Sequence, residues 1–334
     1  MNYIYLPERK YNMNAIDFYI KILEDAFRNN GEDVERISNL KVVKKGDRVV
    51  VIVVNDFVKV LLKKRSVKIY MWFQGITPEE MIMNLKGWER FKANFIWTIL
   101  EIMTLWFSKG NVMVSEAMVD HFRKKYGYKR QNYTIMPCFN QELKPNAFSQ
   151  SKYEYPTFVY SGSLAKWQCF DTTIDTFKVI LKAIPSAKLA IFTGMVDEAK
   201  RIVAEKGLSN VLVKNVPYTE LEDEIKGFKY GFLIRDDLKL NNVATPTKMS
   251  SYIGCGIIPI YSPYIKDYDK QFKNKKYFVR VGSEKEMIDK LVQLEREDIL
   301  AKDVYEEYSE IFNTYYSRER YIEEISDFYK KNDC

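Results

Sequence analysis

The sequence predicts an α/β protein built from two doubly wound, parallel-sheet domains and a helical tail. Short apolar runs alternate with helical segments along the chain, and strands that are joined through helices lie parallel to one another. The alternation is interrupted once, over residues 140–156, which contain two prolines and no apolar periodicity, and then it starts again. Each of the two blocks has the length of an ordinary domain.

The first block opens with a strand over residues 3–6 and a helix over residues 15–29, in which apolar side chains recur at helical spacing. The run RVVVIVV at residues 48–54 is continuously apolar, which is typical of a strand buried in a parallel sheet. The other elements expected here are strands at 34–37, 67–73, 111–114 and 133–136, and helices at 55–64, from Pro78 onward and from Ser115 to Lys125.

Residues 95–107 form the most apolar helical stretch of the chain. The stretch is too short to span a bilayer and contains Glu101, so we expect a buried core helix. The alternative that stays open is a helix whose aromatic face inserts partly into a membrane surface.

The second block repeats the pattern from residue 158. Its expected strands are 158–160, 188–192, 210–214, 230–234, 257–260 and 276–281, and its expected helices are 171–183, 197–206, 218–227, 245–254, 284–295 and a tail from about 299 to 331. We therefore expect an N-terminal domain over 1–145, a linker over 146–156, a C-terminal domain over 157–305, and a tail over 306–334 that packs back toward the N-terminal domain. The two domains are expected to face an interdomain cleft.

The most informative segment is RDDLKLNNVATPTKMSSYIGCG, residues 235–256, which lies between two apolar runs. Loops at the carboxyl ends of parallel strands are where α/β sheets bind ligands. We expect Thr245 to cap the helix and Pro246 to fill its first position. Lys248 then lies in the first turn, where a cation is unfavourable unless an anion binds beside it. Arg235 and Lys248 suit a phosphate or diphosphate, and a solvated surface lysine is the alternative.

A second segment, SGSLAKW at residues 161–167, follows the first strand of this block. Gly162 lets the backbone approach a ligand closely, and Lys166 can reach a phosphate from the same loop. The sequence contains no Walker loop, no GxGxxG motif and no His and Cys cluster of the kind that binds zinc.

Together, FVYSGSLAKWQCFDTTIDTF, LIRDD and NNVATPTKMSSYIGCGIIPI resemble the C-terminal domain of family-4-like glycosyltransferases of the GT-B fold, in particular a bacterial surface-polysaccharide branch. The likeness covers residues 157–262, and MWFQGITPEEM, VMVSEAMVDHFRKKYG and IMPCF extend it into the N-terminal half. It implies a UDP- or GDP-linked sugar donor in the C-terminal domain and a glycan or lipid-linked acceptor in the N-terminal domain. It also implies retention of anomeric configuration, no essential metal and no cofactor besides the donor substrate.

Carried onto this chain, the resemblance assigns the donor diphosphate to Arg235 and Lys248, a catalytic pair that would stabilise the charge growing on the leaving group. Gly162, Ser163 and Lys166 would form the phosphate loop. The other donor-binding residues that it implies are Thr193, Gly194, Val216, Tyr218, Thr247 and Ser251, and the expected acceptor-binding residues are Arg9, Lys10, Gln74 and Gly75.

Two positions depart from the family pattern. Ser251 stands where relatives usually place a Glu that binds ribose hydroxyls, and a Ser hydroxyl has a shorter reach. Gln74 stands where many relatives have His, so it can orient a hydroxyl group but cannot act as a general base. Ser251 prompts the alternative of a degenerate nucleotide-sugar-binding or scaffold subunit, and a nucleotide-sugar epimerase of the same fold is a second alternative.

Two further features resemble catalytic motifs, but we expect neither to be one. The single histidine, His121, lies in a predicted helix beside basic residues and is expected to be structural. Asp267-Tyr268-Asp269 matches the metal-binding Asp-x-Asp of the other major glycosyltransferase fold, but its place late in the second block favours a chance match. No metal site is expected.

The net charge of +7 is unevenly distributed. Residues 1–150 contain 24 Lys and Arg against 16 Asp and Glu, which gives +8 and leaves −1 for the remainder. The basic half could attract an anionic membrane surface or a lipid-diphosphate acceptor, and no nucleic-acid recognition motif accompanies it. The four cysteines are far apart and the first residues lack a signal-peptide core, so we expect a cytoplasmic protein, at most peripheral at the inner face of the cell membrane.

Overall fold

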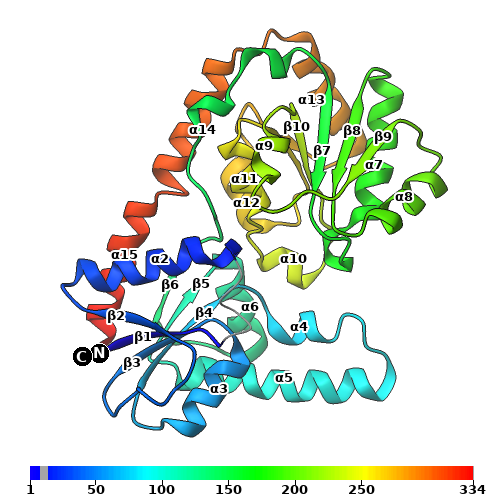
Figure 1. The fold of residues 1–334 in the computed structure, drawn as a ribbon. Coiled ribbons are helices and arrows are strands. Elements are labelled where there is room, and N and C mark those ends of the chain that lie inside the picture. Colours follow the sequence, from blue (N-terminus) through cyan, green and yellow to red (C-terminus); the bar gives the residue numbers. More distant parts are fainter. Residues whose placement is uncertain (8–13, 334) are drawn as a thin grey trace. The chain divides into compact units, whose positions relative to one another are not determined.

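The computed structural model describes residues 1–7 and 14–333, and the chain forms two compact units (Figure 1). The first unit comprises Met1–Asn140, Val243–Thr245 and Ser317–Cys334. The second unit comprises Gln141–Asn242 and Pro246–Tyr316. Each contains a six-stranded sheet, and the strand pairs that the structure describes are parallel. The predicted α/β class with two parallel sheets is therefore confirmed.

The sheet of the first unit has the strand order β2-β1-β3-β4-β5-β6. Its strands are β1 (Asn2–Tyr5), β2 (Val34–Ile37), β3 (Arg48–Val51), β4 (Lys68–Phe73), β5 (Gly110–Met113) and β6 (Tyr133–Ile135). The central strands are apolar on both faces, as expected for a parallel sheet between two layers of helices. The predicted strand over 48–54 stops at Val51, because Val54 already begins the next helix.

Helices cover this sheet, and the last helix of the chain is among them. They are α2 (Asn14–Asn29), α3 (Val54–Lys63), α4 (Thr77–Met81), α5 (Gly87–Phe107), α6 (Glu116–Tyr126) and α15 (Arg318–Asp333). α15 packs against α2, where the rings of Phe27 and Tyr329 stack with centroids 4.1 Å apart. Asn30 on the adjoining turn donates a hydrogen bond to the carbonyl of Ser326 at 2.9 Å. The C-terminal helix is thus part of the first unit.

α5 is not the buried core helix that its sequence predicts. Its buried side chains are Glu101, Thr104 and Leu105, all in the last two turns. The preceding turns are exposed or half-buried, and the side chains of Trp88, Phe91 and Phe95 are exposed to solvent. The high apolar content therefore belongs to an exposed face rather than to the core. Within the described residues, no helix has both the length and the apolar character needed to cross a bilayer.

The sheet of the second unit has the strand order β12-β11-β10-β7-β8-β9. Its strands are β7 (Thr157–Ser161), β8 (Lys188–Phe192), β9 (Val211–Lys214), β10 (Tyr230–Leu233), β11 (Ile258–Tyr261) and β12 (Val279–Arg280). Its α-helices are α7 (Phe170–Ala183), α8 (Val196–Glu205), α9 (Leu221–Ile225), α10 (Lys239–Val243), α11 (Lys248–Gly254), α12 (Lys266–Phe272), α13 (Glu284–Arg296) and α14 (Ala301–Thr314). The sequence patterns did not reveal α10 and α12, which are short.

The boundary between the units lies at Asn140, a few residues before the predicted end of the N-terminal domain at 145. Residues 146–156, expected to be a linker, are packed into the second unit. There the buried ammonium of Lys152 donates to the carbonyl oxygen of Cys255 at 2.6 Å, and the hydroxyl of Tyr153 donates to that of Gly256 at 2.7 Å. The expected tail over 306–334 is divided, since α14 belongs to the second unit and α15 to the first.

Candidate functional site

The second sheet has its topological switch point between β7 and β10. The chain runs from β7 outward through β8 and β9 and then returns to β10 on the other side of β7. Loops that leave two neighbouring strands in opposite directions open a crevice at their carboxyl ends, where open α/β sheets bind ligands. Gly162 follows β7 and Arg235 follows β10, so the fold places two of the predicted site residues at this crevice.

Arg235 is buried, with 3% of its surface exposed, and its guanidinium contacts only neutral acceptors. Nη1 donates to the carbonyl oxygens of Gln168 and Ile234 at 3.0 and 2.9 Å. Nη2 donates to the side-chain oxygen of Gln168 at 2.7 Å. No carboxylate among the described residues pairs with it, so a buried positive charge lacks a counterion at this crevice.

Lys248 brings a second cation to the same point. Its Nζ donates to the same side-chain oxygen of Gln168 at 2.9 Å and lies 4.2 Å from the ring centre of Tyr160. Burial lowers the pKa of the ammonium well below its usual value, and the neighbouring Arg235 lowers it further. Because both cationic nitrogens bond one oxygen, they lie less than about 6 Å apart. An anion placed between them would relieve both the repulsion and the lost hydration.

Gln168 therefore supplies the shared acceptor of the two cations. It ends the short 3-10 helix Lys166–Gln168, which precedes α7. A carboxamide oxygen carries a partial negative charge and accepts two hydrogen bonds, so it can serve both cations at once. Nothing in the sequence singles out Gln168, because its role depends on two cations that lie 67 and 80 residues away along the chain.

Gly162 is favoured by its backbone conformation and lies close to the end of the Lys248 side chain. Its φ of +143° is one that residues with a side chain rarely adopt. A Cβ at this position would lie 2.8 Å from both Cε and Nζ of Lys248. The glycine thus leaves room for the lysine side chain at the end of β7, and its predicted close approach to a ligand stays a prediction.

Cys169 ties the loop after β7 to the loop after β10. It adopts a left-handed conformation at the start of α7, with φ of +52°. Its sulfur accepts a hydrogen bond from the backbone N–H of Asp236 at 3.2 Å, and Thr172 on α7 donates to the Asp236 carboxylate at 3.1 Å. These contacts fix Asp236, the neighbour of Arg235, relative to Cys169 and the start of α7.

The other residues expected in the phosphate loop lie on its exposed side. Ser163 and Lys166 are exposed, and the carbonyl of Ser163 accepts a hydrogen bond from the hydroxyl of Tyr160 at 2.6 Å. The Lys166 ammonium has no hydrogen bond or ion pair within the described residues. It lies in the same short helical turn as Gln168.

The residues expected around the nucleotide base follow β8 and β9, the strands next to β7. Thr193 is buried and its hydroxyl accepts from the backbone N–H of Met195 at 3.2 Å, whereas Gly194 is exposed. Val216 is half-buried and Tyr218 is exposed. They share the carboxyl edge of the sheet with Gly162 and Arg235, but the structure brings none of them into the cluster around Gln168.

α11 begins later than the sequence predicts. Lys248 is its first residue and Thr247 its N-cap, and the side chain of Thr247 makes no capping hydrogen bond. The predicted cap, Thr245, is wrong, because its hydroxyl instead accepts from the backbone N–H of Cys138 at 2.9 Å. Ser251 follows one turn after Lys248 and is half-buried. A helix of seven residues with no side-chain cap adds little to the charge of the two cations.

The first unit contains a cavity of about 350 Å³ at the carboxyl ends of β3 and β4. Gln74 and Gly75, the predicted acceptor residues, line it. Its other lining residues are mostly apolar: Ile16, Ile52, Val53, Val54, Met71, Phe73, Thr77, Glu80, Met81 and Trp97. Arg9 and Lys10, also predicted to contact the acceptor, lie outside the described residues.

Glu101 holds the loop that lines this cavity. The carboxylate is fully buried and accepts from the backbone N–H of Thr77 at 2.9 Å and from the hydroxyl of Tyr126 at 2.6 Å. Burial raises the pKa of Glu101 to about 7, although Tyr126, Lys125 and Thr77 favour its charged form. The charge is thus costly to keep in the fold near neutral pH.

Replacing Glu101 with Gln is expected to remove a pH dependence of stability. The pKa of Glu101 is higher in the folded state than the ordinary 4.5, so its contribution to stability falls as pH rises from about 4.5 through 7. Relative to the Glu101→Gln variant, the wild type should lose about 2–3 kcal/mol of unfolding free energy between about pH 5 and pH 8. Urea unfolding of both proteins at the two pH values measures this, and parallel pH profiles would contradict it.

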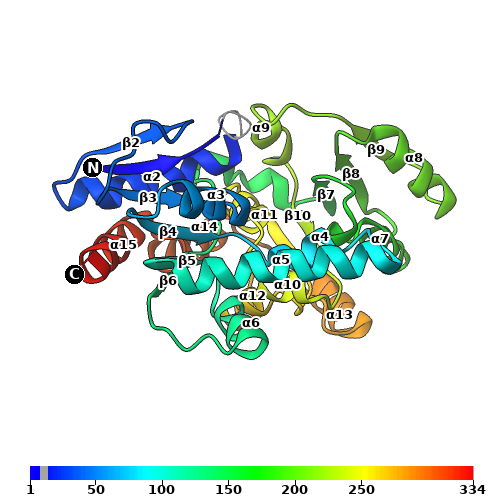
Figure 2. The ribbon, with the colours of Figure 1, turned by 90° about the horizontal axis from the view of Figure 1, so that it is seen from below.

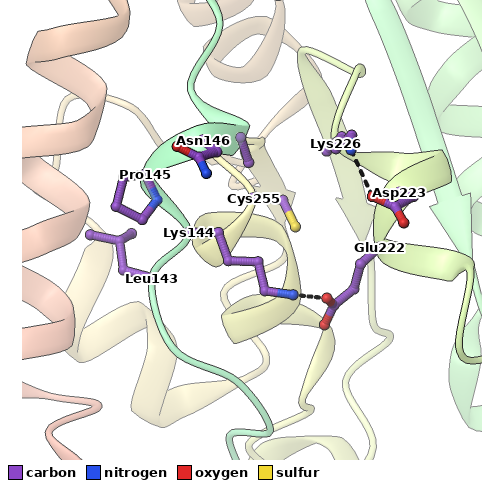
Figure 3. Close-up of a pocket in the computed structure, with 9 residues that line it drawn as sticks. Leu143, Lys144, Pro145, Asn146, Glu222, Asp223, Lys226 and Cys255 are labelled. Carbon is purple, nitrogen blue, oxygen red and sulfur yellow. Dashed lines mark hydrogen bonds and ion pairs between the residues drawn. The ribbon is translucent and has the colours of Figure 1, made fainter.

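A second cavity, of about 370 Å³, lies in the second unit and is shown in Figure 3. Its charged side chains pair with each other, Lys144 with Glu222 and Lys226 with Asp223. Cys255 contributes a thiol, and burial raises the pKa of this group. Since its cations already have carboxylate partners, this cavity differs from the crevice around Arg235.

The remaining polar motifs are engaged in internal contacts. His121 lies on α6 with its Nε2 3.5 Å from a carboxylate oxygen of Glu79. In the Asp-x-Asp sequence on α12, Asp269 pairs with Arg280 at 2.5 Å and Asp267 accepts from the hydroxyl of Tyr315. Across residues 1–7 and 14–333, no group of three or more His, Cys, Asp and Glu side chains is arranged to hold a metal.

The sequence matches no protein-family model and no curated protein. Its structure, however, is similar to several solved ones. A mutant of S. aureus TarM in complex with fondaparinux, α-GlcNAc-glycerol and UDP matches 88% of this chain at 15% identity with a TM-score of 0.65. The chain spans only 57% of that TarM chain and 56% of another TarM structure.

Two further similar structures are sugar-phosphate synthases. Sucrose-phosphate synthase from Thermosynechococcus elongatus aligns with 99% of this chain and 98% of its own at 11% identity, with a TM-score of 0.69. An α,α-trehalose-phosphate synthase (UDP-forming) from Burkholderia vietnamiensis aligns with 93% of this chain and 79% of its own at 9% identity, with a TM-score of 0.60. The chain therefore has the GT-B fold of these glycosyltransferases.

Proposed function

We propose that this protein is a glycosyltransferase that moves a sugar from a nucleotide diphosphate, UDP- or GDP-linked, to a glycan or lipid-linked acceptor in bacterial surface-polysaccharide synthesis. One observation supports this above the others. Arg235 and Lys248, two cations with no carboxylate partner in the described chain, converge on a single oxygen at the switch point of the second sheet. A buried cation pair of this kind suits the diphosphate of a sugar nucleotide.

In the proposed mechanism, diphosphate oxygens displace the side-chain oxygen of Gln168 and bond Arg235 and Lys248 directly. As the bond between sugar and diphosphate breaks, negative charge grows on the leaving diphosphate, and the two fixed cations stabilise it where water is excluded. No resident metal is assigned a role in this scheme. Transfer with retention of configuration follows the family resemblance.

The remaining donor contacts are also proposals. Gly162, Ser163 and Lys166 would surround the phosphates, while Thr193, Gly194, Val216 and Tyr218 would border the base. These residues share one edge of the second sheet, which supports a common site. Thr247 and Ser251 would approach the ribose or phosphate from α11.

The acceptor is proposed to bind in the first unit. Gln74 and Gly75 line its 350 Å³ cavity, where the Gln74 side chain could orient an acceptor hydroxyl. The mostly apolar lining suits an acceptor with an apolar portion. Arg9 and Lys10 precede this cavity in the chain and would contribute positive charge.

The proposal is tested by a screen of nucleotide sugars for their effect on thermal unfolding. The donor should raise the melting temperature by several degrees, because a ligand at about one hundred times its Kd stabilises a fold by about 2.7 kcal/mol. UDP and GDP without sugar should show which base is accepted. If no nucleotide or nucleotide sugar shifts the melting temperature, the proposed function fails.

Product analysis then separates the alternatives. A glycosyltransferase forms a new glycoside only when an acceptor is added, whereas an epimerase converts the donor without one. A scaffold subunit, the alternative suggested by Ser251, would bind the nucleotide sugar and convert it under neither condition.

A further inference from the structure

The exposed face of α5 is the largest feature that donor binding leaves unexplained. Seven large apolar side chains on this one helix are more than a third exposed: Trp88, Phe91, Phe95, Ile96, Ile99, Trp106 and Phe107. A large contiguous apolar patch on a soluble protein marks a surface that binds something. Figure 2 shows α5 along its whole length, with no other element of the first unit in front of it.

Most of these side chains form a continuous stripe along one face of the helix. Positions 88, 91, 95, 99 and 106 follow helical spacing and so lie on one face. The exposed fractions of Trp88, Phe91 and Phe95 are 74%, 61% and 60%, and the rings of Trp88 and Phe91 stack at 5.4 Å. The helix has 21 residues, so the stripe runs for about 30 Å.

Basic side chains lie near the stripe, Lys92 beside it and Arg90 on the opposite side of the helix. Lys86 precedes the helix, Arg90 and Lys92 lie in its first two turns, and all three are exposed. None of them has an ion pair or hydrogen-bonded partner among the residues that the structure describes. Glu89 is the one exposed carboxylate that α5 offers against them. The first 150 residues as a whole carry a charge of +8.

We infer that α5 is an interfacial helix that seats the first unit on an anionic lipid bilayer. Helices that lie in the plane of a membrane combine an apolar face rich in Trp and Phe with Lys and Arg beside it. Trp is enriched at the level of the lipid headgroups. The rings enter the boundary between headgroups and acyl chains, and Lys92 beside them faces the lipid phosphates. Lys86 and Arg90 lie farther round the helix and add positive charge within about one helix diameter of the surface.

Charge favours a bilayer over a second copy of this chain. A second copy would bring the same three cations to the interface, with Glu89 as the only exposed carboxylate on the helix to meet them. An anionic membrane supplies negative charge along the full length of the stripe.

The position of α5 also bears on substrate access. Trp97 lies on α5 and lines the same cavity as Gln74 and Gly75. A bilayer in contact with the exposed side of α5 would therefore lie within the width of one helix from that cavity. The acceptor headgroup of a lipid could enter from the membrane surface. The membrane contact itself does not depend on nucleotide binding by the second unit.

The test is sedimentation of the full chain with vesicles of phosphatidylcholine, with and without about one third phosphatidylglycerol. The wild type should bind the anionic vesicles and bind the neutral ones weakly. The triple variant Trp88→Ser, Phe91→Ser and Phe95→Ser should partition at least about tenfold less. Replacing Lys86, Arg90 and Lys92 with Gln should weaken binding to anionic vesicles only, by up to about fivefold per charge, with the largest share from Lys92.

A matched control removes three exposed apolar side chains elsewhere, Leu62→Ser, Tyr155→Ser and Leu212→Ser, and should bind vesicles as the wild type does. Thermal unfolding verifies that every variant is folded.

Equal partition of the wild type and the α5 aromatic variant would overturn the inference, as would a wild type that binds no anionic vesicle. A dimer that the α5 aromatic substitutions abolish, without vesicle binding, would assign the face to a second copy. If neither the wild type nor its variants bound a nucleotide, the proposed function would be contradicted, but the result on vesicle binding would still stand.

Discussion

Replacing Lys248 with Ala, or Arg235 with Ala, is expected to weaken UDP binding by at least about thirtyfold, and the double substitution to abolish it. Both side chains donate to one oxygen of Gln168 in the free protein, at 2.9 and 2.7 Å. A diphosphate in that place would bond both, so removal of either one leaves anionic oxygens without a partner in a buried site. Isothermal titration calorimetry with UDP measures the change.

Calorimetry also measures proton uptake on UDP binding, which would not change if Lys248 had only a structural role. Burial lowers the pKa of Lys248 well below its usual value in the free protein, and a bound diphosphate should raise it again. Between the pKa values of the free and the bound ammonium, the wild type should therefore take up protons when it binds UDP and its affinity should fall as pH rises, whereas Lys248→Ala should do neither. Lys182→Ala, an exposed lysine on α7, is the control. Unchanged UDP affinity in both the Lys248 and Arg235 variants would refute the site.

Replacing Gln168 with Glu is expected to close the site. A carboxylate at this position would pair with Arg235 and Lys248, so the folded state should become more stable while UDP binds about one hundredfold more weakly. Gln168→Ala should have the opposite effects, so the folded state should become less stable and UDP should bind more tightly. It leaves two cations without their shared acceptor, which costs about 1–3 kcal/mol of stability, and it frees the place of a phosphate oxygen.

The opposite signs of the two variants make this experiment decisive. Differential scanning calorimetry gives the stability and titration calorimetry gives the affinity for each variant. Gln131→Glu, which adds the same charge at an exposed position of the first unit, should leave both quantities unchanged. If Gln168→Glu binds UDP as tightly as the wild type, Gln168 does not occupy a phosphate position.

Much of the fold follows from local sequence patterns. Strands such as β3 and β10 are runs of apolar residues, and α2 and α13 repeat their apolar side chains at helical spacing. Such patterns involve only neighbouring residues, so they can be recognised without knowledge of tertiary contacts. The grouping of Gly162, Arg235 and Lys248 was also accessible, because each follows a strand or opens a helix at the carboxyl edge of one sheet.

Features that depend on contacts between residues far apart in the chain could not be predicted from the sequence. Gln168 matters only because Arg235 and Lys248 meet beside it. Thr245 is a residue type that often caps a helix, but its hydroxyl accepts a hydrogen bond from the backbone N–H of Cys138, which is far away in the sequence. Composition predicted a buried α5, since an apolar face has the same sequence pattern whether a core or another surface covers it.

The chain passes between its two units at three places: after Asn140, around Val243–Thr245, and after Tyr316. The middle passage is anchored at both ends. Ser115 donates to the carbonyl of Val243 at 2.6 Å, and Thr245 accepts from the backbone of Cys138 at 2.9 Å.

Only Pro246 and Thr247 separate this anchored passage from Lys248. The start of α11 is therefore tied, through two residues of chain, to hydrogen bonds made within the first unit. The backbone position of a residue at the carboxyl edge of the second sheet thus depends on contacts that the first unit makes.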